Sequence, residues 1–212
     1  MRRKQLLKAP EIAVVDAQLL QLLKRAHQIL GAGSLLANRP SRAFRAAGGR
    51  LRFQSMPSKH SAGLVVHRSR EGGLEVLLVH PGGPYWAKKD RGAWSIPKGE
   101  FDPIEETDAL LVARREFEEE TGQPIAGDFV PLKEIRQAGG KIVRAWAVAG
   151  DLDVSVVKSN SFTMEWPPRS GQSRSFPEVD RAEWFPIAEA KERILPGQRP
   201  LLEQLEALLG DR

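Results

Sequence analysis

The chain contains no cysteine among its 212 residues. This absence excludes disulfides, thiolate metal sites and cysteine nucleophiles, and it is common in proteins of a reducing compartment. No apolar run approaches the ~18 residues that a membrane helix requires, and no segment resembles a secretory signal. We therefore expect a cytoplasmic protein without a membrane span.

Acidic residues are scarce in the first 60 residues, which hold 12 Lys and Arg against only Glu11 and Asp16. The rest of the chain holds 20 basic and 25 acidic residues, a net charge of −5, although the whole chain carries +5. The basic total therefore gives no argument for nucleic-acid binding by the main part of the chain. We expect an N-terminal extension over residues 1–55, with a helix at about 11–30 and then a basic linker, and a second domain over 56–212.

The strongest chemical pattern is the run REFEEETG from Arg115 to Gly122. On a helix, Glu116, Glu119 and Glu120 share one face, because the spacings i, i+3 and i+4 return to the same side. Three carboxylates placed in this way repel one another, and they are the hard oxygen ligands that suit Mg2+ or Mn2+. Phe117, together with Leu110 and Ala113 earlier on the same side, predicts an apolar face beside the acidic one, and Glu118 is expected to point to solvent. A solvated acidic surface is the plain alternative for such a run taken alone.

The longer segment WSIPKGEFDPIEETDALLVARREFEEETG, residues 94–122, resembles the Nudix box, G-x5-E-x7-R-E-U-x-E-E-x-G-U, in which U is a bulky apolar residue. The resemblance extends from about Ser61 to the C-terminus. It implies an α+β fold, the Nudix α/β/α sandwich with a mixed sheet. The matching residues are Gly99, Arg115, Glu116, Phe117, Glu119, Glu120 and Gly122.

Two departures from the motif are visible. Gln123 stands where the motif has an apolar residue, and the spacing from Gly99 to Arg115 is two residues longer than the motif allows. Counting forward from Gly99 makes Glu105 the leading glutamate, whereas counting back from Arg115 reaches Thr107. Residues 102–105, DPIE, predict a helix start with an aspartate N-cap and a capping-box glutamate, and Thr107 offers a later cap.

The remaining elements follow from turn residues and periodicity. Residues 61–70 and 74–80 predict one hairpin, and residues 129–137 and 141–150 predict a second. We expect residues 151–174 to be irregular, a strand over 175–185, and helices over 188–194 and 200–209.

Four residues are candidates for substrate binding. Tyr85 and Lys88 lie in a loop rich in aromatic and cationic residues, which suits stacking on a base or binding phosphate, with plain loop packing as the alternative. Arg144 shares a strand face with Trp146. Lys98 lies beside the glycine turn and is the natural phosphate partner.

The family resemblance implies roles for the acids in a metal-dependent pyrophosphohydrolase. Glu116 and Glu120 would be the principal Mg2+ ligands, with Mn2+ as a substitute, together with the Gly99 carbonyl. Glu119 would be a further ligand or the base that orients water, and Arg115 would hold the acids in position. A second acid outside the helix, Glu178 or its competitor Asp180, would complete the site, with an ordinary strand-edge charge as the alternative.

The expected partner is a small-molecule nucleotide, with no nucleic acid required, and the sequence leaves the oligomeric state open. The preferred substrate is a nucleoside diphosphate linked to another moiety, best a dinucleoside polyphosphate. A nucleoside triphosphate and a non-hydrolytic nucleotide sensor are the alternatives. For the extension we weigh an organelle presequence, a basic tail and non-native upstream sequence. We favour the last, because the segment from Met56 resembles the usual beginning of Nudix proteins.

Overall fold

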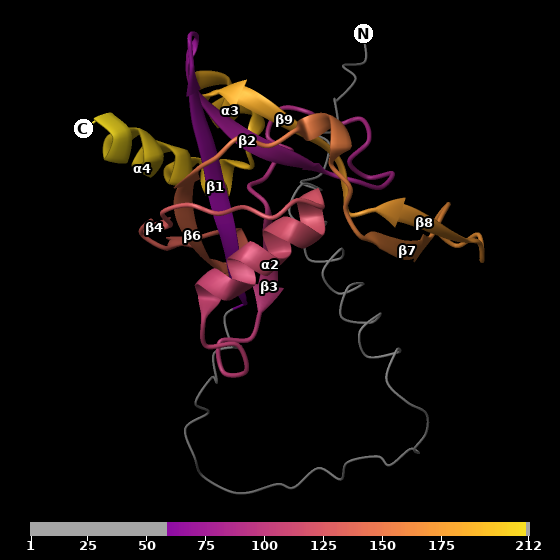
Figure 1. The fold of residues 1–212 in the computed structure, drawn as a ribbon. Coiled ribbons are helices and arrows are strands. Elements are labelled where there is room, and N and C mark those ends of the chain that lie inside the picture. Colours follow the sequence, from indigo (N-terminus) through magenta and orange to yellow (C-terminus); the bar gives the residue numbers. More distant parts are fainter. Residues whose placement is uncertain (1–58, 211–212) are drawn as a thin grey trace, which may run out of the picture.

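A computed structural model describes residues 59–210 (Figure 1). The extension expected over residues 1–55 and its helix at 11–30 lie outside these residues. Within the described part, no helix is long and apolar enough to cross a membrane.

A seven-stranded mixed sheet forms the centre of the domain, with β1 (His60–Arg70) inside it. Strand β1 pairs in parallel with β6 (Ile142–Ala149), and antiparallel with both β2 (Gly73–Pro81) and β3 (Lys98–Phe101). Residues 61–66 of β1 are all buried, as expected for an inner strand that is covered on both faces. The outer strands are β9 (Val179–Pro186), which pairs with β2, and the short β4 (Val130–Pro131) and β5 (Ile135–Arg136), which pair with β6.

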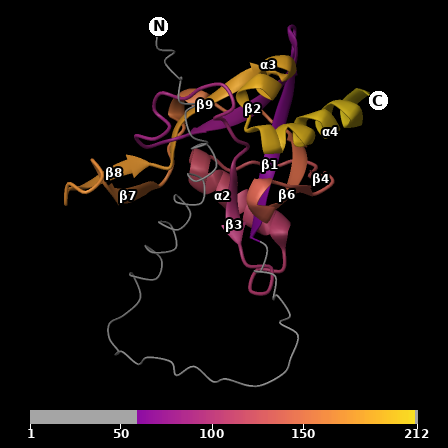
Figure 2. The same ribbon diagram turned by 180° about the vertical axis from the view of Figure 1, so that it is seen from behind.

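Helices cover both faces of this sheet. Helix α2 (Ala109–Thr121) crosses one face in Figure 1, and α4 (Arg199–Gly210) is seen in front of the other face in Figure 2. The short helix α3 (Ile187–Arg193) packs on β2 and β9. Each face has its own apolar core, one centred on Phe117 of α2 and the other on Leu201, Leu202 and Leu205 of α4. The expected α/β/α sandwich is confirmed.

Most predicted elements are present, with one clear error. The first hairpin is confirmed as β1 and β2, and the last two helices as α3 and α4; the second hairpin has an interrupted first half, β4 and β5. The prediction of an irregular 151–174 segment is wrong, because β7 (Ser161–Glu165) and β8 (Ser173–Pro177) form a separate hairpin. Strand β8 has few apolar residues, so its sequence gives little strand signal. The strand predicted over 175–185 is split at Glu178 into β8 and β9.

Three 3-10 turns complete the fold, η1 (Ala138–Gly140), η2 (Val154–Val156) and η3 (Pro196–Gln198).

The segment before β3 is fixed between the sheet and the C-terminal helices. The Ser95 N–H donates to the Val79 carbonyl at 2.9–3.0 Å in a reciprocal pair of backbone bonds. The buried Gln198 side chain accepts a hydrogen bond from the Ile96 N–H at 3.1 Å. Gly63 is required opposite this segment, since a Cβ there would lie 2.5 Å from the Pro97 carbonyl oxygen. These contacts place the start of β3 beside α2.

Candidate active site

Helix α2 presents its carboxylates as the sequence predicts. Glu116 and Glu120 are 7% and 8% exposed, Glu119 is half-buried, and Glu118 is exposed. Phe117 on the adjoining face is fully buried in the core against the sheet. One face of the helix therefore packs on the core, and the next holds two buried carboxylates, which is costly unless they have partners.

The partners of these carboxylates include the backbone of β3. The Lys98 N–H donates to the Glu120 carboxylate at 3.1 Å. The Glu116 carboxylate lies where a side chain on residue 99 would stand, because a Cβ on Gly99 would come within 1.8 Å of it. A glycine is therefore needed at this position for close packing of the acid against the strand, and it brings the Gly99 backbone next to Glu116.

Arg115 is the cation that compensates these acids. Its guanidinium lies 3.1 Å from Glu116 and 3.2 Å from Glu119, and a third carboxylate, Glu106, lies at 3.1 Å. Burial alone would lower the pKa of Arg115, but the charge of Glu116 and the contact with Glu119 outweigh it and raise the pKa. Arg115 therefore remains charged and holds the acids in position.

The start of α2 differs from both sequence-based alternatives. The helix is capped by Asp108, whose carboxylate accepts hydrogen bonds from the N–H groups of Leu110 and Leu111 at 3.0 and 3.2 Å. The cap predicted at Asp102 is wrong, because Asp102 instead closes a turn with the N–H of Ile104. Thr107 is not the cap either. The two extra residues are thus accommodated in the loop before the helix.

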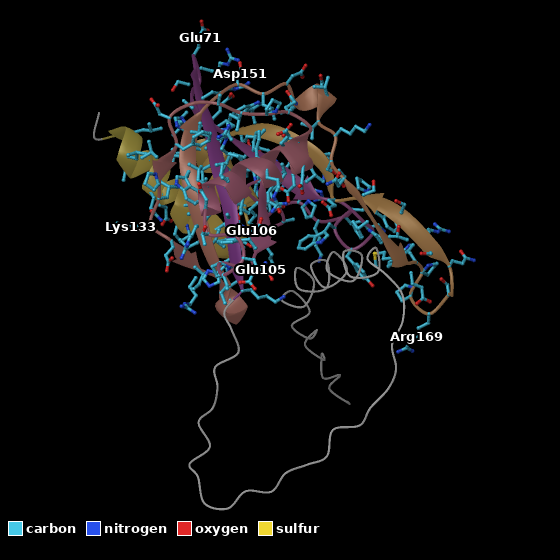
Figure 3. The ribbon with its side chains drawn as sticks, turned by 60° about the horizontal axis from the view of Figure 1, so that its bottom comes forward. Glu71, Glu105, Glu106, Lys133, Asp151 and Arg169 are labelled. Atoms are coloured by element: carbon cyan, nitrogen blue, oxygen red, sulfur yellow. The ribbon has the colours of Figure 1, made fainter. Side chains whose placement is uncertain are left out.

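Neither count located the glutamate that contacts Arg115. Glu105 is exposed, whereas its neighbour Glu106 forms the contact. Both glutamates are labelled in Figure 3. The loop conformation selects between the two residues, and motif spacing alone gives no information about it. Glu106 is therefore a site residue that sequence reasoning missed.

The donor set suits a hard divalent cation. It consists of carboxylate oxygens and backbone, and the glycine cradle leaves no side chain between Gly99 and Glu116. Across residues 59–210, no three Asp, Glu or His side chains stand close enough to form a ready-made metal site. Arg115, which lies against both Glu116 and Glu119, supplies the positive charge between them in this structure.

Lys98 directs its side chain to the other face of the sheet. Gly99 pairs with Ala62, a core residue on the α2 side, so Lys98 and Glu100 point to the opposite side. There Lys141, a residue not predicted from sequence, lies 2.9 Å from Glu100 and is only 12% exposed. Burial, reinforced by the nearby charge of Lys98, lowers the pKa of Lys141 to about 8. The only sign of Lys141 in the sequence was its position as a lysine directly before the residues of β6.

The other predicted binding residues lie apart from one another. Arg144 is on the α2 face of β6 and pairs with Glu134 at 3.6 Å. Tyr85 packs edge-on against Trp166 of the β7–β8 hairpin, with ring centres 5.3 Å apart, and Lys88 is exposed in the same loop as Tyr85.

Glu178 and Asp180 have different surroundings. Asp180 contacts His80 at 2.7 Å, and His80 packs on Trp94 in the core opposite α2. Glu178 is half-buried, and its N–H donates to the Asn160 carbonyl at 2.8 Å. Of these two acids, Glu178 is the one attached to the segment that faces α2.

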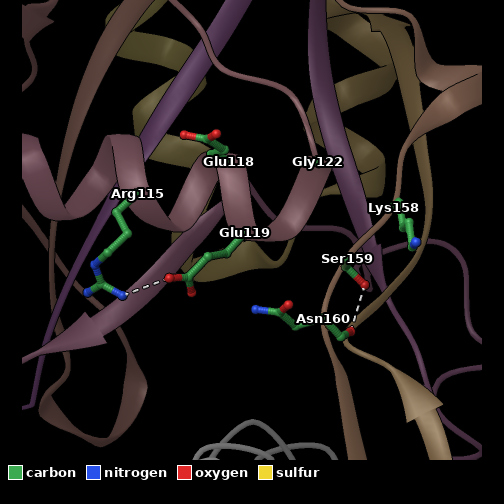
Figure 4. Close-up of a pocket in the computed structure, with 7 residues that line it drawn as sticks. All are labelled: Arg115, Glu118, Glu119, Gly122, Lys158, Ser159 and Asn160. Carbon is green, nitrogen blue, oxygen red and sulfur yellow. Dashed lines mark hydrogen bonds and ion pairs between the residues drawn. The ribbon is translucent and has the colours of Figure 1, made fainter.

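A groove of about 520 Å3 runs along α2 next to Glu119 (Figure 4). One wall is the C-terminal half of the helix, and the other is the segment 158–160 before β7. In Figure 4 the Asn160 amide points across it toward Glu119, whose carboxylate is turned toward Arg115. Its lining residues are Arg115, Glu118, Glu119, Gly122, Lys158, Ser159 and Asn160.

The family model described as NUDIX domain matches residues 57–205. The chain belongs to the Nudix family. A search of the curated proteins found no significant match. The chain is a Nudix hydrolase, an enzyme that acts on pyrophosphate bonds. Nudix hydrolases generally use divalent cations, in agreement with the oxygen donors on α2.

Solved structures of Nudix proteins align with this chain. The NUDIX domain of Shewanella oneidensis NrtR, crystallised with ADP ribose, aligns with a TM-score of 0.52 and 17% identity over 73% of this chain and 90% of that chain. A Caenorhabditis elegans Ap4A hydrolase aligns with a TM-score of 0.49 and 22% identity over 73% of this chain and 99% of that chain. A mutT/nudix family protein from Listeria innocua gives 0.47 and 18%, over 74% and 97% of the two chains.

Proposed function

We propose that the protein is a Mg2+-dependent pyrophosphohydrolase that cleaves a nucleoside diphosphate linked to another moiety, with a dinucleoside polyphosphate as the preferred substrate. The observation that carries this proposal is the packing of two buried carboxylates, Glu116 and Glu120, against the backbone of β3. A purely structural helix gains nothing from burying like charges beside each other, since each costs desolvation free energy.

In this proposal Glu116, Glu120 and the Gly99 carbonyl would hold Mg2+, and Mn2+ could replace it. When bound, the cation would neutralise charge on the diphosphate and activate water. Arg115 keeps Glu116 and Glu119 in register through its contacts at 3.1 and 3.2 Å.

The chemical step needs a base and a place for the phosphates. Glu119 is exposed enough to reach water in the groove, and we assign it the proton that leaves the attacking water. The new bond joins that water oxygen to phosphorus, and the bridging P–O bond breaks, with its electron pair leaving on the departing phosphate. Glu178, bonded through its backbone to Asn160, is the proposed second acid near this groove.

The proposed phosphate and base contacts come from side chains outside the helix. Lys98 remains a proposed phosphate contact at the start of β3, where its N–H donates to Glu120, and its side chain extends to the face of the sheet opposite α2. Arg144, Lys88 and Tyr85 remain proposed contacts for the more distant parts of the nucleotide. Their separation in the structure suits an extended substrate rather than a compact one.

A substrate panel tests the proposal. Diadenosine polyphosphates, ATP, dGTP and ADP-ribose are incubated with the protein and Mg2+, and products are separated by anion-exchange chromatography. We expect the highest kcat/KM with a diadenosine polyphosphate. Preferred cleavage of ATP or dGTP would move the assignment to nucleoside triphosphates. Tight nucleotide binding without turnover of any substrate, in either Mg2+ or Mn2+, would identify a sensor instead.

A further inference from the structure

The segment 158–160 lies outside the Nudix box, yet it is bonded directly to the end of α2. The Lys158 N–H donates to the Thr121 carbonyl at 3.2 Å, and the Asn160 N–H donates to the Glu119 carbonyl at 3.3 Å. Carbonyls in the last turn of a helix have no partner within the helix, so this segment satisfies two of them. The segment is therefore held at a fixed distance from Glu119.

Two small residues make this close approach possible. Gly122 ends α2 in the left-handed conformation, with φ of 73°, and a Cβ there would lie 2.9 Å from the Lys158 carbonyl oxygen. The Ser159 hydroxyl accepts a hydrogen bond from the Val179 N–H at 2.9 Å. The serine thus ties the segment to β9, and its hydroxyl serves that structural purpose.

The hydrogen-bond donors around the groove differ in how many partners they already have. Arg115 contacts three carboxylates. The side chains of Asn160 and Lys158, by contrast, make no hydrogen bond or ion pair with any residue between 59 and 210. The Asn160 amide points toward Glu119, while Lys158 lies farther along the groove, near Gly122 (Figure 4).

We infer that this groove binds the phosphate chain of the substrate, with Asn160 donating to an oxygen of the attacked phosphate beside Glu119 and Lys158 binding the chain farther out. The inference rests on the proposed function and adds two specificity residues to it. An amide is a neutral donor, so it stabilises a phosphate oxygen without forming an ion pair that would occupy the Glu119 carboxylate. A lysine serves as a point charge for phosphate. The volume of about 520 Å3 lies within the ~300–1,000 Å3 of small-molecule sites.

The test compares Asn160→Ala and Lys158→Met with matched controls, Gln172→Ala and Lys133→Met, which change an exposed amide and an exposed lysine elsewhere. The anchoring bonds of Asn160 use its backbone, so both groove variants keep the segment in place. ADP in Mg2+ is the probe, titrated by calorimetry. We expect each groove variant to weaken ADP binding about tenfold. In hydrolysis of a diadenosine polyphosphate, each should raise KM by a similar factor and leave kcat within about twofold of wild type.

A structural role is separated from a binding role by Ser159→Ala, which removes the tie to β9. We expect this variant to lower Tm, whereas Asn160→Ala and Lys158→Met leave Tm unchanged. The inference is overturned if the wild type does not bind ADP, or if both groove variants bind ADP as the controls do. Weakened ADP binding in the groove variants, together with no hydrolysis of any substrate, would support the groove as a nucleotide site while removing the hydrolase function.

Discussion

Lys141 provides a quantitative test of the geometry beside β3. Its side chain is 12% exposed and lies 2.9 Å from Glu100. Burial and the charge of Lys98 lower its pKa from the ordinary 10.5 to about 8. A difference of one pKa unit between folded and unfolded states corresponds to about 1.4 kcal/mol. Keeping Lys141 charged in the folded protein at neutral pH therefore costs about 3 kcal/mol.

The sign of the pH dependence follows from proton uptake. At about pH 9 the unfolded chain still holds a proton on Lys141, while most folded molecules have lost it, so the unfolded state binds more protons. The free energy of unfolding then rises with pH. Below about pH 8 the folded protein carries the full cost of the charged amine. The cost is relieved between about pH 8 and 10.5, so the free energy of unfolding rises there, and it does not change further above that range.

The assay is urea unfolding followed by circular dichroism, for the wild type and Lys141→Met, at about pH 7, 8, 9 and 10. Titrating groups away from Lys141 contribute alike to both proteins, so the difference between the two free energies reports on Lys141 and its charged neighbours Glu100 and Lys98. We expect that difference to move in favour of the wild type by about 2–3 kcal/mol from pH 7 to pH 10. A difference that stays constant within about 0.5 kcal/mol would refute the buried position of the amine.

Four further predictions concern the acids, the metal and the extension. Gly99→Ala should lower kcat about 100-fold with the fold retained, because a Cβ displaces the Glu116 carboxylate lying 1.8 Å away, whereas Gly72→Ala, with nothing within 4 Å, should be neutral in the same assay. Glu119→Gln and Glu120→Gln should each reduce kcat by about two or more orders of magnitude at saturating Mg2+, with circular dichroism unchanged. EDTA should abolish hydrolysis, and with Mg2+ restored the rate should rise from about pH 7 to 9; undiminished turnover in EDTA would contradict the metal assignment. Removal of residues 1–55 should leave kcat/KM and Tm unchanged if the domain begins at residue 56, and a loss of several degrees would show that the extension is part of the fold.

The local features of this site could be predicted because they depend on periodicity and steric need. The spacing of Glu116, Glu119 and Glu120 places them on the acidic side of α2, and the burial of two of them agrees with that reading. Gly99 matches a motif glycine because the Glu116 carboxylate occupies the space of a side chain there. The hairpin of β1 and β2 could be predicted from the turn residues Glu71 and Gly72 between the two strands.

The features that the sequence did not reveal depend on tertiary contacts. Glu106, rather than Glu105, reaches Arg115 because of how the loop before α2 folds. Lys141 joins Glu100 only because the parallel pairing of β1 and β6 aligns two distant segments. Asn160 comes opposite Glu119 through backbone bonds across 41 positions of sequence, and no local pattern encodes such a contact.

The central claim is that the carboxylates of α2 serve metal-dependent cleavage of a phosphate anhydride. Its most direct test is the turnover of diadenosine tetraphosphate in Mg2+ by the wild type and by Glu120→Gln, with mononucleotide products measured by anion-exchange chromatography. The account predicts cleavage by the wild type and a rate at least about 100-fold lower in the variant. Equal rates in the two proteins, or no cleavage by a wild type that binds the substrate, would contradict it.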